Sequence, residues 1–167
     1  MSSEAFTTAM FLIAAIISAG VLINAVFPVI YTLSGTISSS SHTVDERLST
    51  DVKVVTTYAS GGSKEAKIWL KNVGTARISP SDVGKTDVFL GVPGNFTRLG
   101  LVSGTPGSNQ WTYKILEDTQ KNNHWDPGET LYIQARSDTI PMSGEVVYFQ
   151  FVLSTGLSRS TTFTAGT

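Results

Sequence analysis

The pattern of apolar and polar residues divides the chain into two parts that meet near residue 50. From Ala5 to Leu33 no side chain is charged, and after Glu4 the next charge is Asp45. This run is apolar around its whole circumference, and it exceeds the roughly 20 apolar residues that a helix needs to cross a bilayer. From Asp51 the period of the pattern changes to two, which is typical of strands. We therefore predict a long transmembrane-type α-helix followed by a β domain.

Three interpretations of the apolar run compete: a secretory signal peptide, a buried helix of a soluble protein, and a retained helix. A signal peptide has a basic region before its apolar core, whereas only Met1, Ser2, Ser3 and Glu4 precede this run. A helix that lies at the surface of a soluble core keeps a polar face, which this run lacks. We therefore expect a retained helix that spans a bilayer or packs in the core of a helical assembly.

The run also contains small and hydrogen-bonding residues of the kind that let helices approach and bond one another, namely Thr7, Thr8, Ser18, Gly20 and Asn24. The Ser and Thr hydroxyls can equally bond their own backbone carbonyls, and the sequence leaves both interpretations open. Pro28 removes one backbone donor and is expected to bend the helix near Asn24. The expected assembly residues on this helix are Glu4, Phe11, Ile16, Gly20, Asn24, Phe27 and Ile30.

The segment after the apolar run is either a helical stalk or a flexible linker. Apolar residues at 30, 33, 37, 44 and 48 fall on one helical face, but four consecutive serines from Ser38 to Ser41 interrupt this stripe. We favour the stalk, because Asp45, Glu46 and Arg47 then lie away from the stripe. The predicted domains are residues 1–48, the helix and stalk, and residues 49–167, the head.

The head shows short alternating segments separated by turn residues, with no helical period between them. We predict a hairpin from residues 52–57 and 66–71, followed by strands at 87–90, 96–102, 111–116, 130–135, 145–153 and 158–163. Seven or eight short strands at this spacing predict a two-sheet, immunoglobulin-like β-sandwich. The predicted fold class is therefore a long N-terminal helix joined to an all-β sandwich head.

Composition argues against several classes of function. A net charge of −1 with 15% charged residues indicates no nucleic-acid-binding surface. The absence of cysteine excludes a disulfide framework, a thiolate metal site and a cysteine nucleophile. His42 and His124 are the only histidines, and neither belongs to a recognisable acid–base–nucleophile arrangement. We predict that the protein is not an enzyme.

One loop of the head has some character of a metal site. Oxygen-bearing side chains occur at Asp118, Asn122, Asp126 and Glu129, and calcium prefers such ligands. Lys121 lies among them, however, and the regular calcium-loop pattern is missing. The alternative is a structured connection in which Trp125 closes one end of the core. We expect no cofactor, with calcium as the open alternative.

The orientation of the chain is suggested by the head rather than by charge. Arg47 and Lys53 follow the helix, but neighbouring acidic residues offset them, so the positive-inside rule gives no answer. Asn95-Phe96-Thr97 fits the N-glycosylation pattern, with Asn95 as the acceptor on a predicted surface turn. The sequon and the sandwich suit the outer face of the cell envelope, so we expect an extracellular head.

Several stretches together resemble the archaellin-like proteins of the archaeal motility filament, the archaellum. The resemblance is carried by Glu4 ahead of the apolar run, by the junction SGTISSSSHTVDERLSTDVKVV, and by the head pattern KNVGTARIS…WDPGETLYI. The chain is most similar to the short accessory members of this family, the F and G proteins of the stator. The resemblance implies a type IV pilin-like lollipop. No basic leader precedes Ser2 and the head is short, and both departures favour an accessory subunit.

The resemblance implies a structural role in the archaellum. The helix would contact the membrane and other archaellum subunits, and the head would contact the surface-layer protein or a stator partner. A filament subunit of archaellin or adhesion-pilin type is the alternative within this class. The alternative from another class is a membrane-tethered module that binds sugar or calcium.

Overall fold

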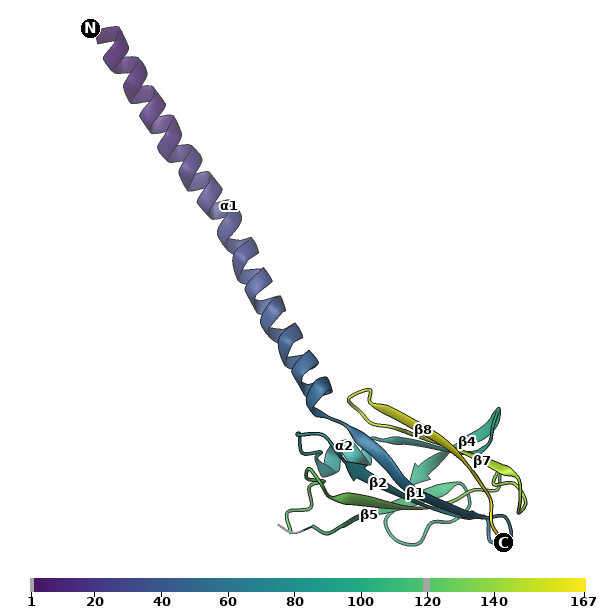
Figure 1. Cartoon of the computed structure of the whole chain (residues 1–167). Helices are drawn as coiled ribbons and strands as arrows, with labels where there is room; N and C mark the ends of the chain where they lie inside the picture. The colour runs from purple at the N-terminus through teal and green to yellow at the C-terminus, as the bar shows by residue number, and fades with distance from the viewer. Residues whose placement is uncertain (1, 119–120) are drawn as a thin grey trace. The chain divides into compact units, whose positions relative to one another are not determined.

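The computed structural model describes residues 2–118 and 121–167, with the side chains of residues 2 and 38–48 left out. The chain forms two compact units, residues 1–44 and 45–167. Helix α1 extends from Ser2 to Ser49 and continues through Pro28 without interruption (Figure 1). The predicted stalk is therefore helical in its backbone, while His42 and the stripe residues at 44 and 48 lie outside the described side chains. Helix α1 ends one residue after the predicted domain boundary.

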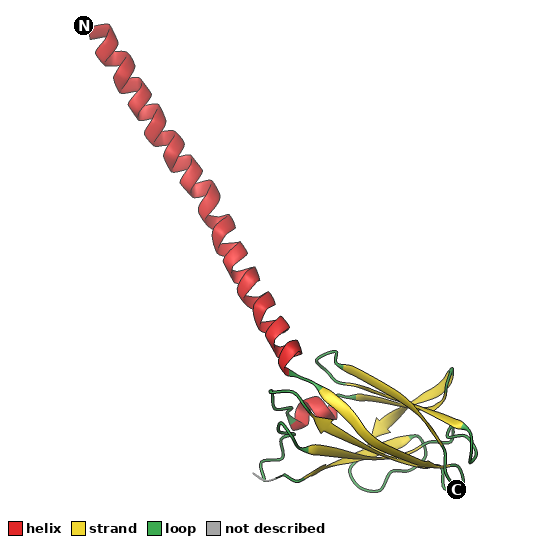
Figure 2. Ribbon diagram, in the orientation of Figure 1, coloured by secondary structure: helices red, strands yellow, loops and turns green. Residues whose placement is uncertain are grey.

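The head is a β-sandwich of eight strands (Figure 2). They are β1 (Val52–Ser60), β2 (Glu65–Asn72), β3 (Asp87–Val92), β4 (Asn95–Leu101), β5 (Gln110–Leu116), β6 (Thr130–Arg136), β7 (Val146–Val152) and β8 (Ser158–Thr164). Their order is β1-β2-β6-β5-β4-β3-β7-β8. All neighbours are antiparallel except β4 and β5, which pair in parallel over two residue pairs and so join the two halves. The predicted fold class is confirmed.

The core is built from the inward-facing positions of these strands. Ile68 and Leu70 of β2 and Leu131 and Ile133 of β6 are completely buried, as their alternation predicts. In β1 the alternation is shifted by a bulge between Val54 and Thr56, which changes the register against β2. A bulge inserts one unpaired residue, so the inward face of β1 continues at half-buried Thr57 and buried Ala59.

The head also contains a short helix that the all-β prediction missed. Helix α2 (Pro80–Gly84) follows Ser79, whose hydroxyl accepts from the Asp82 backbone N–H as an N-cap. The same hydroxyl donates to the Asp82 carboxylate and holds the pKa of Asp82 below its ordinary value, against the opposing effect of partial burial. The missed signal was an N-cap serine, then a proline at the first helical position, then an acidic residue.

Buried Asn72, at the end of β2, holds together the two head motifs KNVGTARIS and WDPGETLYI. Its carboxamide donates to the carbonyls of Ala76 and Trp125 and accepts from the Gly74 N–H. Its backbone N–H donates to the Glu129 carbonyl, and its carbonyl accepts from Gly128. A buried polar group that satisfies all its hydrogen bonds fixes its surroundings in one arrangement. The two motifs are therefore one structural unit, although about fifty residues of chain separate them.

The loop from Asn72 to Ala76 also binds the chain where α1 ends and β1 begins. The N–H groups of Thr75 and Ala76 donate to the Ser49 carbonyl at 2.8 and 3.0 Å, and those of Val73 and Gly74 donate to the Asp51 carbonyl at 2.9 and 3.0 Å. Ser49 is the last residue of α1, where carbonyls lack partners within the helix. The loop therefore caps the end of α1. We call these four hydrogen bonds the junction clamp.

Replacing Gly74 by alanine is expected to destabilise the head. A Cβ at this position would clash with the Ser49 carbonyl oxygen and lie 2.5 Å from the Asp51 nitrogen, both of which are backbone atoms. Overpacking of this kind costs about 1–3 kcal/mol. The measurement is denaturant unfolding of the full chain by tryptophan fluorescence, since all three tryptophans lie in the head.

The matched control is Gly100→Ala, because nothing lies within 4 Å of a Cβ at Gly100. We expect this variant to unfold at nearly the same denaturant concentration as the unchanged protein. Equal unfolding midpoints for both variants would contradict the junction clamp.

Candidate assembly site

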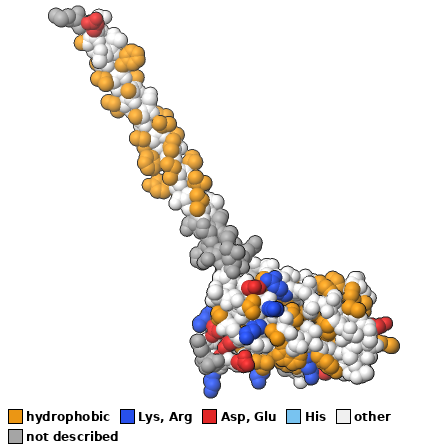
Figure 3. All heavy atoms as spheres, in the orientation of Figure 1, with side chains coloured by type: hydrophobic (Ala, Val, Ile, Leu, Met, Phe, Trp, Pro, Cys, Tyr) orange, Lys and Arg blue, Asp and Glu red, His pale blue; other side chains and the backbone are white. Residues whose placement is uncertain are grey.

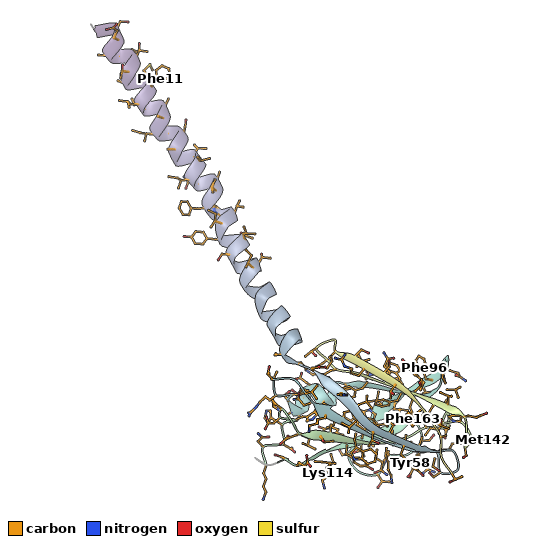
Figure 4. The ribbon with its side chains drawn as sticks, in the orientation of Figure 1. Phe11, Tyr58, Phe96, Lys114, Met142 and Phe163 are labelled. Atoms are coloured by element: carbon orange, nitrogen blue, oxygen red, sulfur yellow. The ribbon has the colours of Figure 1, made fainter. Side chains whose placement is uncertain are left out.

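The surface of α1 between Ala5 and Ile37 carries no charged side chain and is mainly apolar. The segment from Ser3 to Ile37 is long and apolar enough to cross a membrane, by length and composition. Large apolar side chains along it are exposed, with Phe11 at 74% and Ile16 at 71% of their full surface. Figure 3 shows apolar side chains along the helix, an acidic side chain at its N-terminal end, and many charged side chains on the head. Figure 4 shows Phe11 projecting from α1. This surface needs a covering other than water.

The predicted assembly residues do not all share one side of α1. At 100° per residue, Ile16, Gly20, Asn24, Phe27 and Ile30 fall within about 120° of one another, whereas Glu4 and Phe11 fall together on the other side. All of them are exposed. The helix therefore offers apolar contacts in more than one direction, as a helix surrounded by lipid or by several neighbours would. Their role in assembly stays a prediction.

The hydroxyl groups of α1 bond the helix itself. Thr7, Thr8, Ser18, Thr32 and Thr36 each donate to the backbone carbonyl four residues earlier, at 2.8–2.9 Å. Of the two interpretations, the structure therefore supports internal bonding. Because their hydroxyl donors are already used within the helix, these residues offer a neighbouring helix only a weakly polar surface.

Glu4 lies in the first turn of α1, where a negative charge is favourable to the helix dipole. A lone carboxylate is costly to bury in an apolar assembly, so we expect Glu4 either to stay at the water interface or to pair with an amine, its own N-terminal one or that of a neighbouring helix. Met1 lies outside the described residues. The pairing of Glu4 therefore stays a prediction.

The loop between β5 and β6 brings most of the predicted oxygen ligands together. The Asn122 carboxamide donates to the Asp126 carboxylate at 2.8 Å, and the Asp126 N–H donates to the Glu129 carboxylate at 2.9 Å. Asp118 instead accepts from the backbone N–H groups of Asn122 and Asn123. Residues 119 and 120 of the loop lie outside the described part.

The protein already supplies partners for these carboxylates. Arg77, which the sequence analysis did not single out, lies with its Nε 3.1 Å from the nearly buried Asp126 carboxylate. Among the described residues, no group of three or more His, Asp and Glu side chains is arranged to hold a metal ion.

Trp125 occupies the place that the structural alternative predicts. It is completely buried, donates from its ring to the Glu129 carbonyl, and packs edge-on against Phe151. The loop therefore has a clear structural role, while calcium stays an untested prediction.

Asn95 lies where a glycan acceptor should lie. It is exposed at the start of β4, directly after the turn that contains Gly94 with a φ of +85°. Its neighbour Phe96 is 43% exposed and packs against Tyr148 with ring centroids 4.9 Å apart. The predicted surface position is confirmed, and use of the sequon stays a prediction.

Comparison with known proteins links this architecture to archaeal filaments. The sequence profile described as archaeal-type flagellin matches residues 6–163. An uncharacterized protein of Archaeoglobus fulgidus is 24% identical over 166 residues, which cover 98% of this chain and 99% of that protein. The match therefore includes both the helix and the head.

Solved structures share the fold. The archaellum periplasmic stator protein FlaG from Sulfolobus acidocaldarius superposes with a TM-score of 0.54 and 23% identity, covering 68% of this chain and 99% of FlaG. The complex of FlaF and FlaG from the same organism gives 0.54 and 22%, covering 67% of this chain and 87% of the matched one. The archaeal flagellum of Methanospirillum hungatei gives 0.67 and 15%, covering 96% of this chain and 93% of that subunit.

We expect calcium to leave the stability of the head unchanged. Asp118 and Asp126 already accept hydrogen bonds from the protein, and Arg77 supplies a positive charge. The measurement is the thermal midpoint of the full chain in millimolar calcium and in chelator, the range of weak extracellular calcium sites. A calcium-dependent rise in midpoint that Glu129→Gln abolishes would instead establish a calcium site in this loop.

Proposed function

This chain belongs to the archaeal-type flagellin family and has a structural role in the archaellum, and from this premise we propose that it is an accessory subunit anchored by α1. In this proposal the head lies outside the cell, where it contacts another stator subunit or the surface-layer protein. The observation that carries the proposal is the long exposed apolar segment of α1, which has no charged residue between Glu4 and Asp45, joined to a head that holds most of the charged residues.

The length of the apolar segment supports contact with other helices as well as with lipid. Its 35 residues extend about 52 Å at 1.5 Å per residue, whereas a hydrocarbon core is about 30 Å thick. Helix tilt covers part of the difference, and tilts average roughly 20°. The remaining apolar surface requires other apolar helices, and other archaellum subunits are the expected source.

The same excess length favours a second candidate, a subunit of the filament itself. In a filament core every side of an apolar helix is covered by neighbouring copies, so a helix longer than the bilayer is wide suits this role. The two candidates differ in whether the apolar surface of α1 faces mainly lipid or mainly other copies.

The outer location of the head is tested by labelling a single introduced cysteine. The chain has no cysteine, and Met142 is 75% exposed on the head, so Met142→Cys gives one accessible thiol. We expect a membrane-impermeant maleimide to label this variant in intact cells to the same extent as in lysed cells. Ile13→Cys, within the apolar segment, is the matched control and should remain unlabelled in intact cells. Labelling of Met142→Cys only after lysis would place the head inside the cell.

Assembly distinguishes the two candidates. We expect the purified chain to stay in membrane vesicles and to sediment with surface-layer sheets, and Glu4→Gln to leave both properties unchanged, because an interfacial carboxylate adds little to an anchor. For a filament subunit the chain would form helical fibres. Incorporation of Glu4→Gln into them would then fall sharply while membrane levels stay constant, since a charge paired inside an apolar assembly is lost.

A further inference from the structure

The carboxamide of Asn24 is a polar group that α1 does not satisfy. The hydroxyls of the described Thr residues and of Ser18 bond the helix, but Asn24 is exposed and has no hydrogen-bond partner among the described residues. Tyr31 and Ser34 lie nearer the C-terminal end of the apolar segment, whereas Asn24 lies well inside it. A carboxamide has two N–H donors and an acceptor oxygen, and a polar group left unpaired in an apolar medium is costly.

Pro28 adds a second polar group at the same level. In an α-helix the carbonyl of residue 24 accepts from the N–H of residue 28, and proline has no N–H. Helix α1 continues through Pro28, so the Asn24 carbonyl lacks its usual helical donor. Asn24 therefore presents one donor group and two acceptor oxygens at one depth of the helix.

Gly20 leaves room beside these groups. It lies one turn before Asn24 on the same side of the helix, and nothing lies within 4 Å of the point where its Cβ would be. Small residues at this spacing let two helix backbones come close, which shortens the distance that an interhelical hydrogen bond must cover.

We propose that Asn24 is the contact at which two copies of this chain associate through parallel α1 helices in register. The carboxamide of each copy donates to the carbonyl or carboxamide oxygen of Asn24 in the other. A second copy is the fitting partner because donor and acceptors lie at one depth, and a copy in the same orientation presents the same groups at that depth. The segment carries no charge between Glu4 and Asp45, so no charged partner is required.

This inference rests on the proposed anchoring role, in which all copies share one orientation in the membrane. Packing of staggered copies, as in a filament, would place Asn24 opposite a different level of its neighbour. Interhelical hydrogen bonds of this kind change association roughly 5- to 30-fold.

Disulfide cross-linking of the full chain in phosphatidylcholine vesicles tests the contact, because the chain has no cysteine of its own. Ile17→Cys lies on the same side of α1 as Asn24. Ala19→Cys lies on the opposite side, at nearly the same depth in the membrane as Ile17→Cys. We expect oxidation to give at least about fivefold more dimer for Ile17→Cys than for Ala19→Cys. Adding Asn24→Leu should lower the Ile17→Cys yield about 5- to 30-fold, and Asn24→Gln should restore part of it.

The matched control is Ser18→Ala, which removes a hydroxyl already bonded to the Ala14 carbonyl and should leave the yield unchanged. Equal yields on the two sides of the helix, no effect of Asn24→Leu, or an equal effect of Ser18→Ala would each overturn the proposal. Vesicle flotation tests whether each variant is inserted, and tryptophan fluorescence tests whether its head is folded. If Asn24→Leu fails either test, Asn24→Ala is used in its place. If cross-linking contradicts the contact at Asn24 while Met142→Cys is still labelled in intact cells, only the self-association is wrong. If Met142→Cys is not labelled in intact cells, the proposed anchoring role itself is wrong.

Discussion

The apolar surface of α1 must be kept from water, and the rest of the molecule is arranged around this constraint. The helix bonds the described Thr hydroxyls and that of Ser18 to its own backbone carbonyls. Its large side chains remain exposed along 35 residues. At roughly 25 cal/mol per Å² of apolar area removed from water, covering such a surface is a strong drive to association. The function of this half of the chain thus lies in what covers it.

The head differs from α1, because it buries its own apolar side chains and exposes most of its charged ones. Its core runs through both halves of the sandwich, and its buried polar groups are largely bonded within the protein. Arg159 ties the two ends of the strand order by bonding Asp51 and the Val52 carbonyl beside β1 from its place on β8. The apolar core of the head is therefore covered by the head itself.

The sequence predicted elements whose signal is local and could not predict those set by distant partners. The absence of charge from Ala5 to Leu33 defined the helix, and alternation defined the strands, with the first hairpin paired as expected. The pairings of β2 with β6 and of β3 with β7 join segments separated by long stretches of chain, and no local pattern records them. Helix α2 is too short to show a helical period, and its only signal in the sequence is the N-cap pattern that begins at Ser79.

The features of the candidate site also differ in whether local sequence could predict them. The exposed apolar residues of α1 followed directly from composition, whereas the bonding of Thr7 and Ser18 was undecided until the helix geometry was known. The pairing of Arg77 with Asp126 was not foreseen, because the two residues belong to separate loops. The motif around Asn72 could be named from the sequence only as part of a family resemblance. The structure gives its physical role, because Asn72 bonds the segment from Trp125 to Glu129.

The junction clamp has a mechanical consequence. Tension carried along α1 enters the head at Thr50, between the two carbonyls that the loop from Val73 to Ala76 holds. Four backbone hydrogen bonds must break at this point before β1 can be stripped from β2, and the loop that supplies them is fixed from behind by Asn72 and Trp125. Strand β1 is thus held at its first residues by the loop after β2, which the loop between β5 and β6 supports in turn. A force on the helix is therefore distributed over both loops, and the hydrogen bonds between β1 and β2 do not bear it alone.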